Sequence, residues 1–486
     1  MIDDAKNALV WAEIDLGAIA HNVRELRRLT RPEAGLMAVL KANGYGHGAV
    51  PVARTALANG AVSLGVARLG EAITLREQGI TAPILVFGYT PPALAGHLLG
   101  YDLTQTVYAR DPASALAQAA TAAGGKLKVH VKVDTGMGRL GVLLPRGRGE
   151  NGGSQESLHG VAPFPRGQGE TEGRARIPGA TGTLPRGSGE DTCRGSVAPA
   201  GVTAGVRGGG PQAAGAPEGS PAAEREIEEI MRLPGLEVEG LYTHFAGADL
   251  GDKSHAKAQL ARFLSLIDRL RRRGMEFRTT HAANSAAVIE LPEAHLDLVR
   301  PGISLYGLYP SGEVDRTRVA LKPAMSLKSR IIQLQRVPAG FEVSYGMTYE
   351  TPQATVIATV AVGYADGLSR FLSSRGRMLA GGRSVPIAGR VCMDLTMLDV
   401  GERDDLRLGD EVVIFGRQGD LILPVDEVAS RAGTISYEVV SLISERVPRV
   451  YLDSVPVGEV DEARRGCREN PGNPGANVNE ARGGAA

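Results

Sequence analysis

The chain has 486 residues, and its 54 lysines and arginines balance 54 acidic residues, so its formal net charge is zero. This length suggests two or more domains, and the balanced charge argues against nucleic acid or an anionic membrane as a partner. The sequence shows no signal peptide and no apolar run long enough to span a bilayer. The three cysteines, Cys193, Cys392 and Cys467, lie far apart and form no metal-ligand spacing. Small-molecule chemistry in a reducing cytoplasm is therefore favoured.

The first part of the chain alternates strands with helices. After an apolar segment at residues 8–14, Asp15 is expected to cap a helix that reaches Leu29. Five strands are then predicted near residues 36–40, 62–67, 83–87, 104–107 and 127–133, with helices near 49–58, 69–78 and from about 112. The strand at 36–40 is apolar throughout, which is typical of a parallel strand covered on both faces.

Lys41 directly follows the first of these strands. A low-dielectric site disfavours an ammonium and lowers the pKa of a lysine toward its neutral, nucleophilic form, which is the chemistry of a Schiff-base lysine. The glycine-rich residues 43–48 would let backbone N–H groups approach an anion. Taken alone, Lys41 reads more simply as a surface lysine in a turn, so the rest of the chain must decide.

The alternation is interrupted between residues 144 and 221. This stretch holds about a third of all glycines and prolines of the chain and a single aromatic residue, Phe164. A PRG-x-GE repeat recurs in it at Pro145, Pro165 and Pro185, without the apolar face that stacked repeats need. We therefore predict a disordered insertion.

The alternation resumes with helices near residues 222–233 and 254–272 and strands near 236–242, 277–280 and 296–299. Eight β/α units favour a (β/α)₈ barrel, assigned to residues 8–320, over an open doubly wound sheet. Polar residues follow the ends of its strands, where barrel enzymes build their sites. These residues are Lys41, Arg139, His244, Asn284, Ser285, Arg300 and Gly302.

Beyond residue 320 the pattern changes to alternating stretches with little helix, at 325–335, 355–363, 383–400 and 410–415. This pattern predicts a second, β-rich domain at residues 321–456, with a short helix near 425–432. The tail at 457–486 is rich in Gly, Asn and Glu and is predicted to be disordered.

A phosphate site commonly follows strands seven and eight of such barrels. Asn284 and Ser285 lie after the seventh strand, and Gly302 and Ile303 lie after the eighth. A phosphate pocket together with an imine-forming Lys41 indicates pyridoxal phosphate, which carries an aldehyde and a phosphate. Ser285 alone would fit a helix N-cap equally well.

Nine motifs occur in the order and setting of bacterial alanine racemases. They are VLKANGYGHG, VDTGMGRLG, YTHFA, AANSAA, VRPGISLYG, VSYGMTY, VGYADG, VCMDLTMLD and ISYEVV. The resemblance covers residues 8–143 and 222–453 and includes both predicted domains. It implies a homodimer with active sites shared between subunits, which uses pyridoxal 5′-phosphate to interconvert L-alanine and D-alanine for peptidoglycan.

The resemblance also implies roles for single residues. Lys41 would bind the cofactor as a Schiff base and act as the base on one face of the substrate, while Tyr345 from the other subunit acts on the opposite face. Arg300 would face the pyridine nitrogen, and His244 would bridge Arg300 and the tyrosine base. Taken alone, Tyr345 reads as an aromatic residue in a loop, Arg300 as a surface arginine in a salt bridge, and His244 as a structural histidine.

Further matches concern the substrate and the phosphate. Arg139 resembles the arginine that supports the substrate carboxylate, and Lys132 the lysine that is carbamylated in some members to hold that arginine; the sequence leaves the direction of Lys132 open. Met393 would offer its backbone N–H to the substrate carboxylate, between Cys392, which is expected to be structural, and Asp394. Tyr364 resembles a residue at the entrance. The phosphate ligands would be Tyr45, Ser285, Gly302, Ile303 and Tyr437.

Three alternatives stay open. The same scaffold could carry a serine or broad-specificity racemase, or more distantly a decarboxylase, although a decarboxylase would be expected to lack the Tyr345 and Cys392-Met393-Asp394 motifs. A non-enzymatic pyridoxal-phosphate carrier would not need the second domain. The insertion at 144–221 is expected to be dispensable for activity, because loop closure entropy grows only with the logarithm of length. Its arginines leave a partner-binding arm as the alternative.

Overall fold

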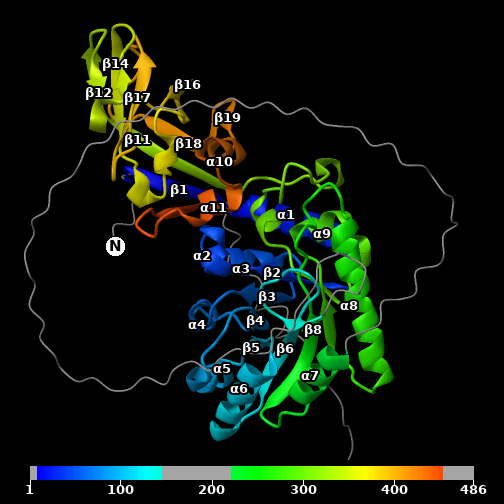
Figure 1. Ribbon diagram of the computed structural model, residues 1–486. Helices are drawn as coiled ribbons and strands as arrows, with labels where there is room; N and C mark the ends of the chain where they lie inside the picture. Colours follow the sequence, from blue (N-terminus) through cyan, green and yellow to red (C-terminus); the bar gives the residue numbers. More distant parts are fainter. Residues whose placement is uncertain (1–7, 145–220, 453–486) are drawn as a thin grey trace, which may run out of the picture. The chain divides into compact units, whose positions relative to one another are not determined.

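The computed structural model describes residues 8–144 and 221–452 (Figure 1). The predicted insertion, apart from its end residues Leu144 and Pro221, and the predicted tail at 457–486 lie outside the described residues.

Eight parallel strands form a nearly closed barrel, as the sequence predicted. In sheet order these are β10 (Leu298–Val299), β2 (Gly35–Val39), β3 (Ser63–Val66), β4 (Ile84–Val86), β5 (Thr104–Val107), β6 (Leu127–Asp134), β8 (Leu236–Tyr242) and β9 (Thr279–His281). Between β9 and β10, the Asp297 N–H donates to the Thr280 carbonyl at 3.1 Å and the Arg300 N–H donates to the Ala283 carbonyl at 3.0 Å. These bonds bring the two ends of the sheet together.

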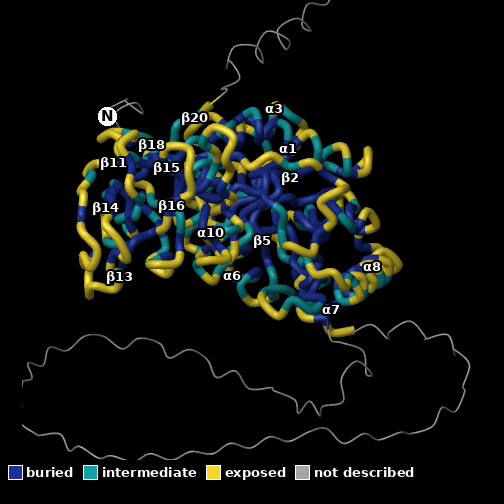
Figure 2. Tube along the Cα trace, turned by 90° about the horizontal axis from the view of Figure 1, so that it is seen from above, coloured by how far each residue is buried: buried dark blue, intermediate teal, exposed yellow. Residues whose placement is uncertain are grey.

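Helices connect the barrel strands. They are α1 (Leu16–Leu29), α3 (Ala49–Ala58), α4 (Leu69–Glu77), α5 (Ala95–Gly100), α6 (Arg110–Ala122), α7 (Pro221–Met231), α8 (Ser254–Arg272) and α9 (Ser285–Glu290). Asp15 caps α1 as predicted, since its Oδ1 accepts from the Ala18 N–H at 2.7 Å. Figure 2 shows the interior around β2 and β5 as buried, whereas α8 has an exposed outer side. Within residues 8–144 and 221–452, no helix is long and apolar enough to cross a membrane.

The C-terminal part is β-rich, as predicted, and contains a second sheet of nine strands. These are β1 (Val10–Asp15), β11 (Met325–Val337), β14 (Thr355–Val360), β15 (Arg377–Ala380), β16 (Arg383–Pro386), β17 (Thr396–Gly401), β18 (Glu411–Gln418), β19 (Leu421–Leu423) and β20 (Arg449–Leu452). A hairpin of β12 (Glu342–Val343) and β13 (Tyr349–Glu350) and the helices α10 (Val425–Ala432) and α11 (Ser436–Ser441) complete it. A short strand, β7 (Val142–Leu143), pairs with β6.

One segment at the start of the predicted barrel range belongs to the C-terminal sheet. Residues 10–15 fall within the range 8–320, but β1 pairs with β11 in antiparallel and with β20 in parallel orientation. The physical reason is that a single half-buried strand fits the edge or centre of any sheet, so its pattern alone does not select a partner.

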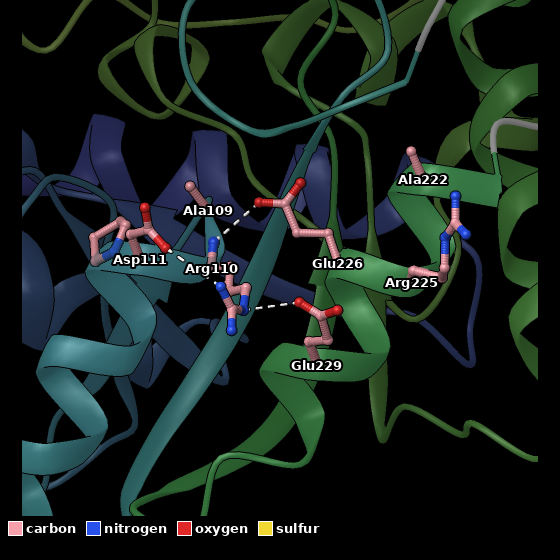
Figure 3. A pocket seen from close by; sticks show the side chains of 8 residues that line it. Ala109, Arg110, Asp111, Ala222, Arg225, Glu226 and Glu229 are labelled. Carbon is pink, nitrogen blue, oxygen red and sulfur yellow. Dashed lines mark hydrogen bonds and ion pairs between the residues drawn. The ribbon is translucent and has the colours of Figure 1, made fainter. Parts of the chain in front are cut away.

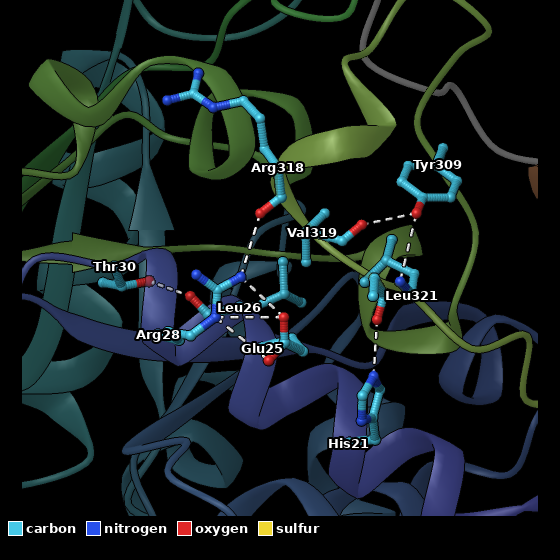
Figure 4. Close-up of polar contacts among 10 residues, drawn as sticks. His21, Glu25, Leu26, Arg28, Thr30, Tyr309, Arg318, Val319 and Leu321 are labelled. Atoms are coloured by element: carbon cyan, nitrogen blue, oxygen red, sulfur yellow. Dashed lines mark hydrogen bonds and ion pairs between the residues drawn. The ribbon is translucent and has the colours of Figure 1, made fainter.

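Helix α1 also contacts the chain that follows the barrel (Figure 4). The His21 Nε2 atom lies 2.7 Å from the Ala320 carbonyl oxygen, and the Arg28 guanidinium donates to the Arg318 carbonyl at 3.2 Å. These bonds fix the segment that leads from the barrel into β11.

Candidate active site

A cavity of about 410 Å³ lies at the C-terminal ends of the barrel strands. It brings together residues that the sequence analysis singled out from widely separated motifs. These are Lys41, Tyr45, Lys132, Arg139, His244, Asn284, Ser285, Arg300, Gly302, Ile303 and Tyr437. The predicted clustering at one face of the barrel is therefore seen in the structure, while the individual roles stay predictions.

Lys41 opens a short left-handed turn, α2 (Lys41–Tyr45). Residues 42 to 45 have φ values of 53°, 52°, 63° and 50°. For a residue with a Cβ, this conformation costs about 1–2 kcal/mol, so the turn persists only where its surroundings determine it. Gly46, at φ 82°, packs so closely that an added Cβ would lie 2.0 Å from the Val440 carbonyl oxygen.

Lys41 lines the cavity and is exposed as a whole residue, while the protein atoms around its amine exclude part of the water that would hydrate it. This loss of hydration lowers the pKa of Lys41, and the positive charge of Arg139 lowers it further, whereas the Glu71 carboxylate acts in the opposite direction. The environment thus shifts Lys41 toward the neutral amine that a nucleophile or base requires.

Arg300, directly after β10, is only 4 % exposed. Its guanidinium donates to His281 Nδ1 at 2.7 Å, to the Thr243 and Ala282 carbonyls at 2.9 and 3.0 Å, and to His244 Nδ1 at 3.3 Å. None of these acceptors is a carboxylate, so the alternative of a surface arginine in a salt bridge is wrong. Burial lowers the pKa of Arg300 to about 10, which still leaves it a cation at neutral pH.

Two buried histidines behind Arg300 were missed by the sequence analysis. His281 Nε2 lies 2.8 Å from His130 Nδ1, and the His281 ring stacks on Tyr242 with 4.6 Å between centroids. Because Arg300 can only donate, His281 Nδ1 must accept, and His281 must therefore donate from Nε2 to His130. Burial lowers the pKa of His130 to about 4 and that of His281 well below its usual value, which keeps both rings neutral.

A signal for His130 was present in the sequence. His130 and Lys132 are two residues apart in LKVHVKV, so a strand places them on the same face. The sequence left open whether the Lys132 side chain points into the barrel or outward. In the structure Lys132 lines the cavity, so it points inward. Burial, with Arg139 and Arg300 nearby, lowers the pKa of Lys132 to about 8.

The loop that carries Arg139 is organised by one carboxylate. Asp134, the last residue of β6, accepts from the backbone N–H groups of Gly136 and Met137, both at 2.8 Å, and of Arg139 at 3.0 Å. These bonds fix the turn after β6 and hold Arg139 at the cavity.

The other end of the cavity lies at β9 and β10. Asn284 Oδ1 accepts from the Ala287 N–H at 3.1 Å and caps α9, so the alternative that Ser285 is the N-cap is wrong. The Ser285 hydroxyl instead accepts from the Gly302 N–H at 2.8 Å. A Cβ on Gly302 would lie 2.5 Å from the Tyr45 phenol oxygen, so only glycine allows Tyr45 to lie here.

The charges of the cavity are strongly one-sided. Among its lining residues, the cationic side chains are Lys41, Lys132, Arg139 and Arg300, and the only carboxylate is Asp249. Burial of unbalanced cations is unfavourable, and an anionic ligand offsets it. The cavity therefore favours a ligand with negative charge.

The remaining predicted residues lie elsewhere, in three loops of the C-terminal part. These residues are Tyr345, Tyr364, Cys392, Met393 and Asp394, and none of them lines the cavity. The Tyr364 N–H donates to the Cys392 carbonyl at 3.0 Å, and Cys392 Sγ lies 3.6 Å from the Ser344 hydroxyl, so the loops contact one another. Tyr345 is 71 % and Met393 53 % exposed.

A second hollow lies between α6 and α7 (Figure 3). Arg110 forms an ion pair with Glu229 at 2.8 Å, and its backbone N–H donates to Glu226 at 2.9 Å. This hollow shares no residue with the cavity around Lys41, and its exposed ion pairs contribute little to stability.

Comparisons with known proteins agree with this arrangement. The chain matches the N-terminal domain family of alanine racemases over residues 14–147 and 215–310, and the C-terminal domain family over residues 324–451. Alanine racemase from Desulfosudis oleivorans is 50 % identical, in an alignment that covers 91 % of this chain and 96 % of the relative. Alanine racemase from Desulforamulus reducens is 44 % identical, in an alignment that covers 91 % of this chain and 99 % of the relative.

Solved structures show the same relationship. Alanine racemase from D-cycloserine-producing Streptomyces lavendulae has a TM-score of 0.73 at 33 % identity, over 92 % of this chain and 98 % of that chain. The enzyme from Bacillus anthracis with bound L-Ala-P has a TM-score of 0.71 at 33 % identity, over 91 % of this chain and 95 % of that chain. The chain thus belongs to the alanine racemase family, with both of its characteristic domains.

Proposed function

We propose that this protein interconverts L-alanine and D-alanine with pyridoxal 5′-phosphate, and that it works as a homodimer. The observation that carries the proposal is the meeting of Lys41, Arg139 and Arg300 in one cationic cavity, while Tyr345 lies exposed on other loops. Membership of the alanine racemase family supports the same reaction, and nothing in the site favours a serine racemase, a decarboxylase or a carrier.

The residues of the cavity fit the proposed cofactor. Lys41 supplies an amine, and the excess of cations suits a phosphate and a substrate carboxylate. The glycine at position 302 leaves room beside Tyr45 and Ser285, where backbone and hydroxyl groups would hold the phosphate together with Ile303 and Tyr437. Arg300 would face the ring nitrogen as a permanent hydrogen-bond donor.

Pyridoxal phosphate, when bound, supplies an electron-withdrawing ring that makes the proton on the α-carbon of the amino acid acidic. The neutral amine of Lys41 would take or return this proton on one face. Arg139 would hold the substrate carboxylate and thereby fix which face is presented. Since Arg300 stays cationic, it would donate a hydrogen bond to the ring nitrogen without passing a proton to it.

A racemase needs a second base on the opposite face of the α-carbon. We assign this role to Tyr345 of a second copy of the chain. Met393, on the loop whose Cys392 contacts Ser344, would donate its backbone N–H to the substrate carboxylate. The exposure of Tyr345, Met347 and Met393 on two loops that contact each other supports the assignment, because exposed apolar side chains that gather on a surface commonly mark a protein interface. Tyr364, which contacts the Cys392 loop, would limit the size of the entrance.

Lys132 is proposed to be carbamylated. Its pKa near 8 leaves a substantial neutral fraction at neutral to mildly alkaline pH, and only the neutral amine adds carbon dioxide. The carbamate would replace a buried cation by an anion between Arg139 and Arg300, which offsets the excess positive charge of the cavity.

The direct test is a racemization assay with purified protein, with and without added cofactor, on a panel of L-amino acids that includes serine. We expect conversion of L-alanine to D-alanine, far slower conversion of serine, and loss of both in Lys41→Ala. Preference for another amino acid would overturn the substrate assignment, and activity in Lys41→Ala would overturn the role of the lysine. The proposal extends to a cytoplasmic supply of D-alanine for peptidoglycan.

A further inference from the structure

The backbone that follows Lys41 has an unusual conformation that something must maintain. Three of the four left-handed residues after Lys41, at positions 42, 43 and 45, carry a Cβ. Asn43 Oδ1 accepts from the Ala49 N–H at 2.8 Å and fixes the far end of the turn. The near end, next to Lys41, is fixed by a residue from another part of the barrel.

That residue is Glu71, in the first turn of α4. Its Oε1 accepts from the Ala42 N–H at 2.6 Å, and its Oε2 accepts from the N–H groups of Ala67 and Arg68 at 2.8 and 3.0 Å. The bonds of Oε2 belong to the capping of α4. The bond of Oε1 is not part of this cap. It joins the start of α4, which follows β3, to the left-handed turn that follows β2.

We propose that Glu71 is a positioning residue for Lys41: its carboxylate holds the left-handed turn and thereby sets the direction in which the Lys41 amine enters the cavity. The proposal rests on the proposed function, in which Lys41 becomes linked to the cofactor. The Glu71 carboxylate also acts on the charge of the lysine, because it raises the pKa of Lys41 against the effect of Arg139.

The chemistry of the carboxylate explains why glutamate is needed. Both oxygens accept, so one side chain can hold two loops at once. In Glu71→Gln the amide nitrogen can only donate, and it would meet backbone N–H groups that also donate. One of the two loops must then lose its partner.

The test measures the binding of two probes to three proteins. The proteins are the parent, the variant Glu71→Gln and the matched control Glu77→Gln, whose substitution lies on the same helix. Pyridoxal phosphate can link to Lys41, and its visible absorbance reports that link. Pyridoxamine phosphate lacks the aldehyde and reports only the pocket for the ring and phosphate. Both affinities are measured on cofactor-free protein, with thermal unfolding as the check of the fold.

We expect Glu71→Gln to weaken the binding of pyridoxal phosphate by about tenfold or more, because a hydrogen bond to a charged group is lost. The affinity for pyridoxamine phosphate should stay unchanged. The kcat for alanine should fall with little change in KM, and Glu77→Gln should behave as the parent. Equal loss of both probes, or loss of neither, would show that Glu71 only caps α4.

Two further outcomes are decisive. If the parent protein itself forms no link between Lys41 and pyridoxal phosphate, the proposed function fails, whatever Glu71 does. If Glu71→Gln does not fold, Glu71→Asp is measured in the same way, because it keeps a carboxylate that reaches only one loop. Loss of the fold in both variants would overturn the proposal, since a role confined to the turn after Lys41 does not account for it.

Discussion

Replacing His281 by leucine removes the nearest hydrogen-bond acceptor of the buried Arg300 guanidinium. Arg300 Nη1 donates to His281 Nδ1 at 2.7 Å, and both side chains are buried. Leucine fills a similar volume but accepts no hydrogen bond, so one guanidinium N–H is left without its partner. His130 loses its donor at the same time.

The magnitude follows from these two bonds. A buried hydrogen bond to a charged group contributes about 1.5–3 kcal/mol, and a neutral one about 1 kcal/mol. We therefore expect His281→Leu to lower the free energy of unfolding by about 2.5–4 kcal/mol. His281→Asn places Oδ1 near the position of Nδ1 and should recover the larger part of this loss.

The assay is urea denaturation of the cofactor-loaded protein, followed by circular dichroism, together with the visible spectrum of the bound cofactor. We expect the leucine variant to show both lower stability and an altered spectrum, because Arg300 is no longer held in one orientation. A leucine variant with the stability and spectrum of the parent would refute the reasoning that His281 orients Arg300.

Three further predictions concern acid, carbon dioxide and the second base. The pKa of His130 in the folded protein is lowered to about 4, so below about pH 6.5 the unfolded state binds more protons at this residue than the folded state does. The free energy of unfolding should therefore drop by about 2–3 kcal/mol between pH 7 and pH 4.5. The drop should be smaller in His130→Gln. Removing bicarbonate should lower activity, and ¹³C-bicarbonate should give a carbamate signal in the parent but not in Lys132→Met; a full rate without carbon dioxide would argue against carbamylation. Tyr345→Phe should slow α-proton exchange in D₂O from one enantiomer by about 10²-fold or more and affect the other less, whereas equal losses would contradict its one-sided role.

Much of the fold was readable because the barrel repeats a simple pattern. Each of the eight predicted strands overlaps an observed one, and Asp15 caps α1 as expected. Period and capping chemistry are local properties, so the sequence contains them. The sequence does not show where β1 pairs, because pairing partners are non-local, and β11 and β20 lie more than 300 residues away.

The site was predictable where polar residues follow strands, and less so where they lie inside the barrel. Lys41, Arg139 and Arg300 stand out because each follows a predicted strand. His130 and His281 belong to strands, where burial and hydrogen-bond partners depend on which residues face each other across the barrel. The contact of Glu71 with the turn after Lys41 joins two loops, and no sequence pattern reports such a contact.

The central claim is that Lys41 and Tyr345 of different subunits act on the same substrate carbon. Mixed dimers of Lys41→Ala and Tyr345→Ala subunits, purified with two different affinity tags, test it directly. In a twofold-symmetric dimer one site would combine the intact Lys41 with the intact Tyr345, so we predict about half of the parent activity per mixed dimer, from two inactive parents. Mixed dimers that form but remain inactive would contradict the account.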